Sequence, residues 1–144
     1  MEYVVLGYGK IGRTIVADIS RYQPDKTISV YDPFVKIMDG FPGNVKFYNS
    51  DPLSEENMLK IFREDTVIIS ALPARLRQKL MLAVIKGKSK LVDITFGNDV
   101  LNDYLPKTEN QDFLIVPDCG LAPGISNFIA GKFASDFKDL ETHP

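Results

Sequence analysis

The sequence contains few of the residues that cross-link small proteins or bind metals in them. Among its 144 residues are one cysteine, Cys119, and one histidine, His143. A single cysteine cannot form a disulfide within the chain and is typical of a reducing compartment, so we expect a cytoplasmic protein. A chain of this length buries roughly two-thirds of the surface that its unfolded form exposes. We therefore expect one core that needs neither a disulfide nor a metal, and we predict no metal site.

The sequence also lacks a charge excess and a long apolar run. Its 17 Lys and Arg residues are balanced by 19 Asp and Glu residues, which argues against a nucleic-acid partner. The longest apolar run, in "TVIISALP", is far shorter than a bilayer span. The opening "MEYVVLG" has neither the basic nor the long apolar region of a signal peptide. We therefore expect small-molecule or protein partners and no membrane association.

Short apolar runs alternate with helix-like segments along the chain. This alternation is typical of a parallel sheet that helices cover on both faces. No repeat, linker or low-complexity tract divides the chain. We predict an α/β fold over residues 1–144, a single doubly wound Rossmann domain with a mostly parallel six-stranded sheet in the order 3-2-1-4-5-6. The expected strands are residues 3–6, 27–31, 45–47, 66–70, 91–94 and 113–116.

Helical periodicity and end signals place the helices between these strands. We expect one helix over residues 11–22, one from Ser54, one over 75–86 and a short one near 99–105. A final helix that begins at Pro123 and Gly124 would carry an apolar face of Ile125, Phe128, Ile129 and Phe133. We expect Phe128, Phe133 and Phe137 to lie in the core or at an interface, and we favour the interface for Phe137.

A glycine-rich loop follows the first expected strand. In "VVLGYGKIGRTI", Gly7, Gly9 and Gly12 have GxGxxG spacing between a strand and a helix, as in dinucleotide-binding domains. Asp32 ends the second strand, where a carboxylate accepts both ribose hydroxyls of an adenosine and repels a 2′-phosphate. We therefore expect NAD to be favoured over NADP, although Lys36 weakens that preference. The alternative is that the glycines serve turns and that Asp32 only forms one.

Three further loops follow the fourth, fifth and sixth strands. Since ligands of open parallel sheets bind outside the carboxyl ends of the strands, we expect residues 70–73, 95–97 and 118–124 to lie on the cofactor edge. Ser126 and Asn127 would stand in the first turn of the last helix. There they could hold a carboxylate or an amide.

The segments "LGYGKIGRTIVADI", "SALP", "LVDITF" and "DCGLAPGISN" resemble the amino-terminal half of the saccharopine dehydrogenase and lysine 6-dehydrogenase family. The resemblance implies an NAD(P)-dependent oxidoreductase that acts on amino-acid carbon–nitrogen bonds. It implies that the adenosine and pyrophosphate would be lined by Gly7, Tyr8, Gly9, Lys10, Ile11, Gly12 and Asp32. The dinucleotide would also lie against Ala71, Leu72 and Pro73, and the nicotinamide and substrate would face a loop containing Asp118, Cys119, Gly120, Ser126 and Asn127.

Members of that family continue into a longer substrate-binding domain, which this sequence does not contain. We therefore expect a cofactor domain that is inactive or incomplete alone and that acts on an amino-acid-like substrate only with a second domain. Two rival functions remain open. One is a ligand-sensing regulatory module like those that gate potassium transport, and the other is an orphan Rossmann domain that forms a homodimer.

The catalytic residues stay unknown at this stage, with Asp118 and Cys119 as candidates. A nearby helix start could lower the pKa of Cys119, but no histidine within the expected core could act as its base, so a packing role competes. Asp118 could take a proton or cap a turn. We expect Asp93 to be structural.

A set of basic residues in and around the helix expected over residues 75–86 should form a solvated face: Arg75, Arg77, Lys79, Lys86, Lys88 and Lys90.

Overall fold

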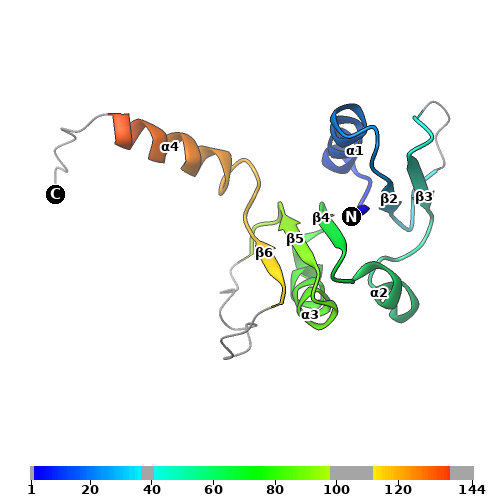
Figure 1. The fold of residues 1–144 in the computed structure, drawn as a ribbon. Helices are drawn as coiled ribbons and strands as arrows, with labels where there is room; N and C mark the ends of the chain where they lie inside the picture. The colour runs from blue at the N-terminus through cyan, green and yellow to red at the C-terminus, as the bar shows by residue number, and fades with distance from the viewer. Residues whose placement is uncertain (1, 37–40, 98–111, 137–144) are drawn as a thin grey trace.

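A computed structural model describes residues 2–36, 41–97 and 112–136 of the chain. Six parallel strands form one sheet in the order β3-β2-β1-β4-β5-β6, which confirms the predicted Rossmann topology (Figure 1). The strands are β1 (Glu2–Leu6), β2 (Ile28–Tyr31), β3 (Val45–Tyr48), β4 (Thr66–Ser70), β5 (Lys90–Asp93) and β6 (Leu114–Val116).

The direction of strand addition reverses at β1. This strand pairs with β2 on one side and with β4 on the other. Backbone hydrogen bonds continue past the strand ends, where the Gly7 N–H donates to the Tyr31 carbonyl over 2.9 Å and the Ala71 N–H donates to the Leu6 carbonyl over 2.8 Å. The loops after β1, β2 and β4 therefore meet at one edge, which is where doubly wound folds bind ligands.

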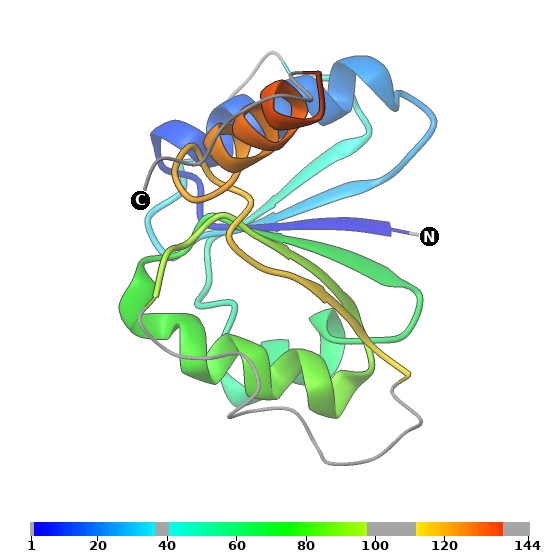
Figure 2. The same ribbon diagram turned by 90° about the vertical axis from the view of Figure 1, so that its left-hand side faces the viewer.

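Helices cover both faces of the sheet. The helix α1 (Lys10–Tyr22) lies on one face, and α2 (Glu55–Ile61) and α3 (Arg77–Gly87) lie on the other (Figure 2). A 3₁₀ turn, η1 (Ala74–Leu76), leads into α3. Since crossovers between parallel strands are right-handed, reversing the direction of strand addition moves the helices to the opposite face.

The sheet divides the core into two layers, and the side chains of the central strand β1 alternate between them. Val4 and Leu6 face α2 and α3 and belong to a cluster that includes Leu80 and Ile68. Val5, between them, belongs to the cluster on the α1 face. All three side chains are at most 2% exposed. The alternation follows from the period of two along a strand, because both faces of this sheet are covered.

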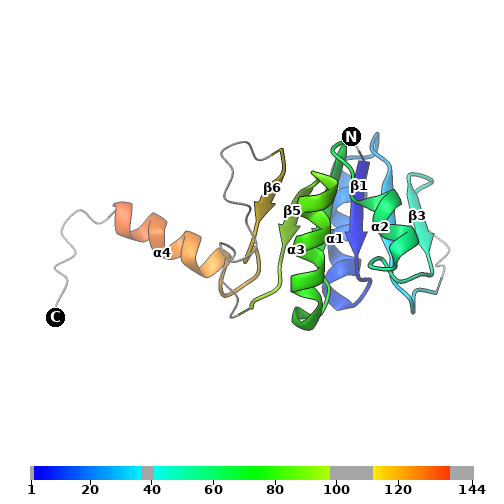
Figure 3. The ribbon, with the colours of Figure 1, turned by 90° about the horizontal axis from the view of Figure 1, so that it is seen from below.

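The last helix, α4 (Ile125–Asp136), extends past β6 and away from the sheet (Figures 1 and 3). None of its residues is buried, and Phe128 is 73% exposed. Core burial, one of the two expectations for Phe128 and Phe133, is therefore wrong, because α4 does not pack on the sheet. Phe137 and the helix expected near 99–105 lie outside the described residues. Within the described ranges, no helix is both long and apolar enough to cross a membrane.

Candidate functional site

The three glycines of the loop after β1 have different surroundings. Gly7 has a φ of +89°, and a β-carbon there would lie 2.8 Å from the Ala71 carbonyl oxygen. A β-carbon on Gly12 would lie 2.0 Å from the Gly7 carbonyl oxygen. Gly9, in contrast, would place a β-carbon with nothing within 4 Å. Gly7 and Gly12 therefore allow close backbone packing, whereas Gly9 leaves an open space at the start of α1.

The start of α1 has no side-chain cap. Gly9 precedes its first residue, no side chain accepts from its first amides, and its first turn contains no acidic residue. The start of α2 differs, because Ser54 caps it and Glu55 and Glu56 lie in its first turn. The first amides of a helix have no intrahelical partner and carry partial positive charge. The open space at Gly9 thus fits the phosphates of a dinucleotide.

Asp32 fastens the glycine loop to the end of β2. Its Oδ2 atom accepts a 2.7 Å hydrogen bond from the Tyr8 N–H, and its Oδ1 atom accepts one of 2.7 Å from the Phe34 N–H. Asp32 therefore forms a turn, as the alternative interpretation predicts. Because both oxygens already accept backbone hydrogen bonds, the carboxylate is less available to two ribose hydroxyls than the sequence pattern suggests.

A hollow of about 560 Å³ opens beside Asp32. Its size is within the range of ligand pockets. Two cations reach it, Arg13 from α1 and Lys36 from the turn after β2. The described residues that line it are Tyr8, Gly9, Arg13, Asp32, Phe34, Val35 and Lys36. Two cations and one carboxylate among these residues favour an anionic group in this hollow.

Arg13 is held over the ring of Tyr8. Its guanidinium carbon lies 5.7 Å from the ring centroid, and its Nε donates to the Tyr8 carbonyl over 3.4 Å. Tyr8 itself is 6% exposed and contacts the rings of Phe41 and Phe47 edge to face. Burial raises the pKa of the Tyr8 hydroxyl, and the nearby Arg13 charge lowers it by less. Arg13 was not among the predicted site residues, although it directly follows the third glycine of the loop.

The loop after β4 lies against the glycine loop, as the contact between Gly7 and Ala71 shows. Leu72 is buried and belongs to the core, so its side chain is less accessible than expected for a cofactor contact. Lys10 and Ile11 are exposed on the first turn of α1. The assignment of these residues, with Pro73, to a cofactor site stays a prediction.

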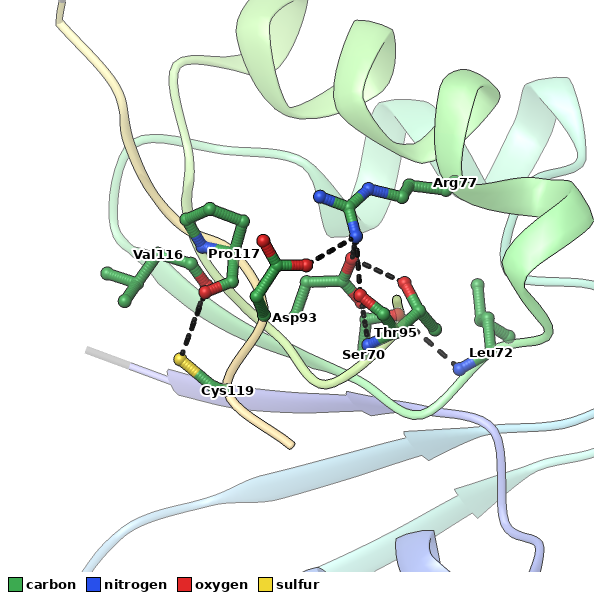
Figure 4. A network of polar contacts seen from close by, with 9 residues as sticks. Ser70, Leu72, Arg77, Asp93, Thr95, Val116, Pro117 and Cys119 are labelled. Carbon is green, nitrogen blue, oxygen red and sulfur yellow. Dashed lines mark hydrogen bonds and ion pairs between the residues drawn. The ribbon is translucent and has the colours of Figure 1, made fainter. Parts of the chain in front are cut away.

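A largely buried ion-pair network joins the start of α3 to the end of β5 and to the loop after β6 (Figure 4). Arg77, the first residue of α3, is 4% exposed, and its Nη1 atom lies 3.0 Å from Asp118 Oδ1 and 3.8 Å from Asp93 Oδ2. The same atom donates to the Thr95 carbonyl. The expectation that Arg77 belongs to a solvated basic face is therefore wrong, because its side chain is buried and forms ion pairs with two carboxylates. The signals available in the sequence were Asp93, which ends β5, and Asp118 in "VPDCG".

Asp93 is fully buried, and the structure supplies its partners. Thr95 donates to it twice, from Oγ1 over 2.6 Å and from its N–H over 3.3 Å. The Asp93 carbonyl accepts from the Cys119 N–H over 2.8 Å. A buried carboxylate without such partners would be costly. These contacts agree with the structural role expected for Asp93.

Cys119 does not have the lowered pKa that a helix start could produce. Burial, followed by the charges of Asp118 and Asp93, raises the pKa of its thiol. The sulfur lies 3.6 Å from the carbonyl oxygens of Val116 and Pro117. The expectation of a lowered pKa for Cys119 is therefore wrong. A raised pKa disfavours the thiolate, which is the nucleophilic form.

The loop from Gly120 to Asn127 uses its polar groups internally. The Asn127 Oδ1 atom accepts from the Gly124 N–H and from the Ser126 hydroxyl, both over 3.2 Å. The Ile125 N–H donates to the Gly120 carbonyl over 3.0 Å.

Among the residues that the structure describes, no group of three or more His, Cys, Asp or Glu could hold a metal ion.

Comparison with known proteins identifies the family. The family model described as the saccharopine dehydrogenase NADP binding domain matches residues 3–114. Among solved structures, apo histidine-tagged saccharopine dehydrogenase (L-Glu forming) from Saccharomyces cerevisiae has a similar fold, with a TM-score of 0.73 and 16% sequence identity. The match covers 94% of this chain and 31% of that chain. No match was found among curated proteins.

The family match overturns one expectation about the cofactor. The matched domain is described as NADP binding, so the prediction that NAD is favoured over NADP is wrong. The structure offers a physical reason. The Asp32 carboxylate is engaged by two backbone amides, and the hollow next to it contains Arg13 and Lys36. The match also favours the dehydrogenase family over a regulatory module of potassium transport.

Proposed function

Since the chain belongs to the family of saccharopine dehydrogenase NADP-binding domains, we propose that it binds NADP across the glycine loop. In this proposal it is the cofactor domain of an oxidoreductase that acts on amino-acid carbon–nitrogen bonds. The single observation that carries the proposal is the combination at the start of α1. An uncapped helix start, an open space at Gly9 and the cations Arg13 and Lys36 surround one hollow.

Each part of this arrangement has a defined role in the proposal. The first amides of α1, from Lys10, Ile11 and Gly12, hold the pyrophosphate. Arg13 and Lys36 hold the 2′-phosphate, because charge-assisted contacts to a phosphate are strong. When bound, the cofactor supplies hydride transfer, so the side chains need only bind and orient it.

The dinucleotide would also lie against the loop after β4. There it would contact Ala71, Pro73 and, largely through the backbone, Leu72. The loop that contains Asp118, Cys119 and Gly120, with Ser126 and Asn127, would face the nicotinamide and the substrate. Asp118 is the stronger of the two catalytic candidates, since the pKa of Cys119 is raised. A small amino-acid-like substrate would bind only with a second domain.

The residues given span 31% of the length of the yeast enzyme that they match. We propose that residues 1–144 form one dinucleotide-binding domain and that turnover needs residues beyond them or another chain. A homodimer and a cytoplasmic location also remain proposals. The apolar residues of α4 are compatible with contact to another domain or a second copy, since none of them is buried.

Isothermal titration calorimetry with NADP, NAD, 2′,5′-ADP and ATP tests the proposal. We expect NADP and 2′,5′-ADP to bind and NAD to bind at least tenfold more weakly, because the 2′-phosphate contacts contribute more than about 1.4 kcal/mol. Absence of NADP binding by folded protein would refute the proposal. A preference for ATP would point to the regulatory alternative. Steady NADPH production from saccharopine or lysine by these residues alone would contradict the need for a second domain.

A further inference from the structure

The network of Asp93, Arg77 and Asp118 carries net negative charge at the cofactor edge. Among the described residues of this network, one guanidinium faces two carboxylates, so there is one carboxylate more than there are cations. Asp93 is fully buried and Arg77 nearly so, whereas the Asp118 side chain is 39% exposed. The excess negative charge is therefore accessible to a ligand at Asp118.

Arg77 fixes the position of this carboxylate. Asp118 has a φ of +58°, a left-handed conformation that L residues seldom adopt, although Asp tolerates it better than most. Its Oδ1 atom accepts from Arg77 Nη1 over 3.0 Å, while the same nitrogen donates to the carbonyl of Thr95. One side chain at the start of α3 thus ties the loop after β6 to the loop after β5 (Figure 4).

The fold places this charge on the side opposite the adenosine hollow. That hollow lies at the ends of β1 and β2, and Asp32 and Arg13 are among the residues that line it. A dinucleotide that crosses the sheet at the strand-order reversal continues from β1 over the ends of β4, β5 and β6. In the proposed binding mode, the nicotinamide half would extend toward the strand ends beside Asp118.

We propose that the Asp118 carboxylate, positioned by Arg77, favours the oxidised, positively charged form of the nicotinamide cofactor over the reduced, neutral form. This inference rests on the proposed function, because it requires that the dinucleotide bind at the glycine loop. A negative charge near the ring stabilises the cationic form and leaves the neutral form almost unaffected. Arg77 is a positioning residue in this account, since it acts through Asp118.

The experiment compares the dissociation constants of NADP⁺, NADPH and 2′,5′-ADP for the wild type and three variants. In Asp118→Asn we expect NADP⁺ affinity to fall about fivefold, as for one partly exposed charge pair, while the other two affinities stay within about twofold. Asp112→Asn is the matched control. It removes an exposed carboxylate that precedes β6, at the opposite end of that strand, and should change none of the three constants.

Arg77→Lys tests the positioning role and keeps the charge. A lysine lacks the planar fork that reaches several acceptors, so we expect NADP⁺ to be weakened relative to NADPH, as in Asp118→Asn. The double variant should shift the ratio no further than Asp118→Asn alone. If Asp118→Asn leaves the NADP⁺ to NADPH ratio unchanged, the inference is overturned. If only Arg77→Lys leaves it unchanged, the positioning role is overturned. Failure of the wild type to bind 2′,5′-ADP would instead refute the proposed function.

Discussion

The carbonyl oxygen of Gly7 lies 2.0 Å from the point where a β-carbon of Gly12 would stand. The backbone of α1 therefore packs on the loop that precedes it with no room for a methyl group. We expect Gly12→Ala to lower the free energy of unfolding by about 3 kcal/mol, because the helix must move away from the sheet. Urea denaturation measures this change.

Gly9→Ala provides the matched comparison, since nothing lies within 4 Å of its β-carbon position. Its φ of −70° suits alanine, so we expect a stability loss of at most about 1 kcal/mol. The methyl group would occupy the space left for the pyrophosphate, and NADP affinity should fall roughly tenfold or more. Equal effects of the two substitutions on stability would contradict this division of roles.

Arg13→Gln should reduce NADP affinity about tenfold and leave NAD affinity almost unchanged, because the lost contact is to the 2′-phosphate. Arg21→Gln, in the last turn of the same helix, is the charge-matched control. Calorimetry at low and high salt would show a weaker salt dependence for the Arg13 variant only. A comparable loss of NAD binding would place Arg13 elsewhere in the site.

Asp32→Asn removes a charge and one of two acceptor oxygens for backbone amides. We expect a loss of about 1–2 kcal/mol in the free energy of unfolding, together with a higher ratio of NADP to NAD affinity, because repulsion of the 2′-phosphate is relieved. Asp51→Asn is a suitable control, since Asp51 accepts from the Leu53 N–H over 2.9 Å in a similar turn after β3. That variant should lose stability without changing the cofactor preference.

The raised pKa of Cys119 predicts slow alkylation near neutral pH. Because the thiolate is the nucleophile, a pKa above the ordinary value of 9.0 moves the rise in rate to higher pH than in the unfolded chain. As the chain contains no other cysteine, iodoacetamide labelling reports this residue directly. Asp118→Asn should move the rise toward lower pH. A folded protein that labels at pH 7 as fast as in denaturant would contradict the expected shift.

The sheet and the glycine loop were predictable because their signals are local. Compact apolar runs fix the strands, and the spacing of Gly7, Gly9 and Gly12 between a strand and a helix fixes the turn. The strand bounds differ from the expected ones by one residue at six of the twelve strand ends, since apolar patterns do not mark where pairing stops.

Arg77 and the cofactor preference were mispredicted because they depend on contacts between distant segments. Arg77 is one of several basic residues in a helical stretch, and only the approach of Asp93 and Asp118 distinguishes it. Asp32 resembles a ribose ligand in sequence. Its hydrogen bond to the amide of Tyr8, 24 residues away, becomes visible only in the fold.

The two core layers separate the regions that tolerate different kinds of change. Tyr8 and Val35 line the hollow and belong to the layer under α1, whereas none of the described residues in the layer under α2 and α3 lines it. Repacking around Leu80 or Met81 can therefore adjust thermostability without retuning nucleotide selectivity. For protein engineering, the two faces of the sheet therefore offer separate sets of positions, one for changing stability and one for changing nucleotide binding.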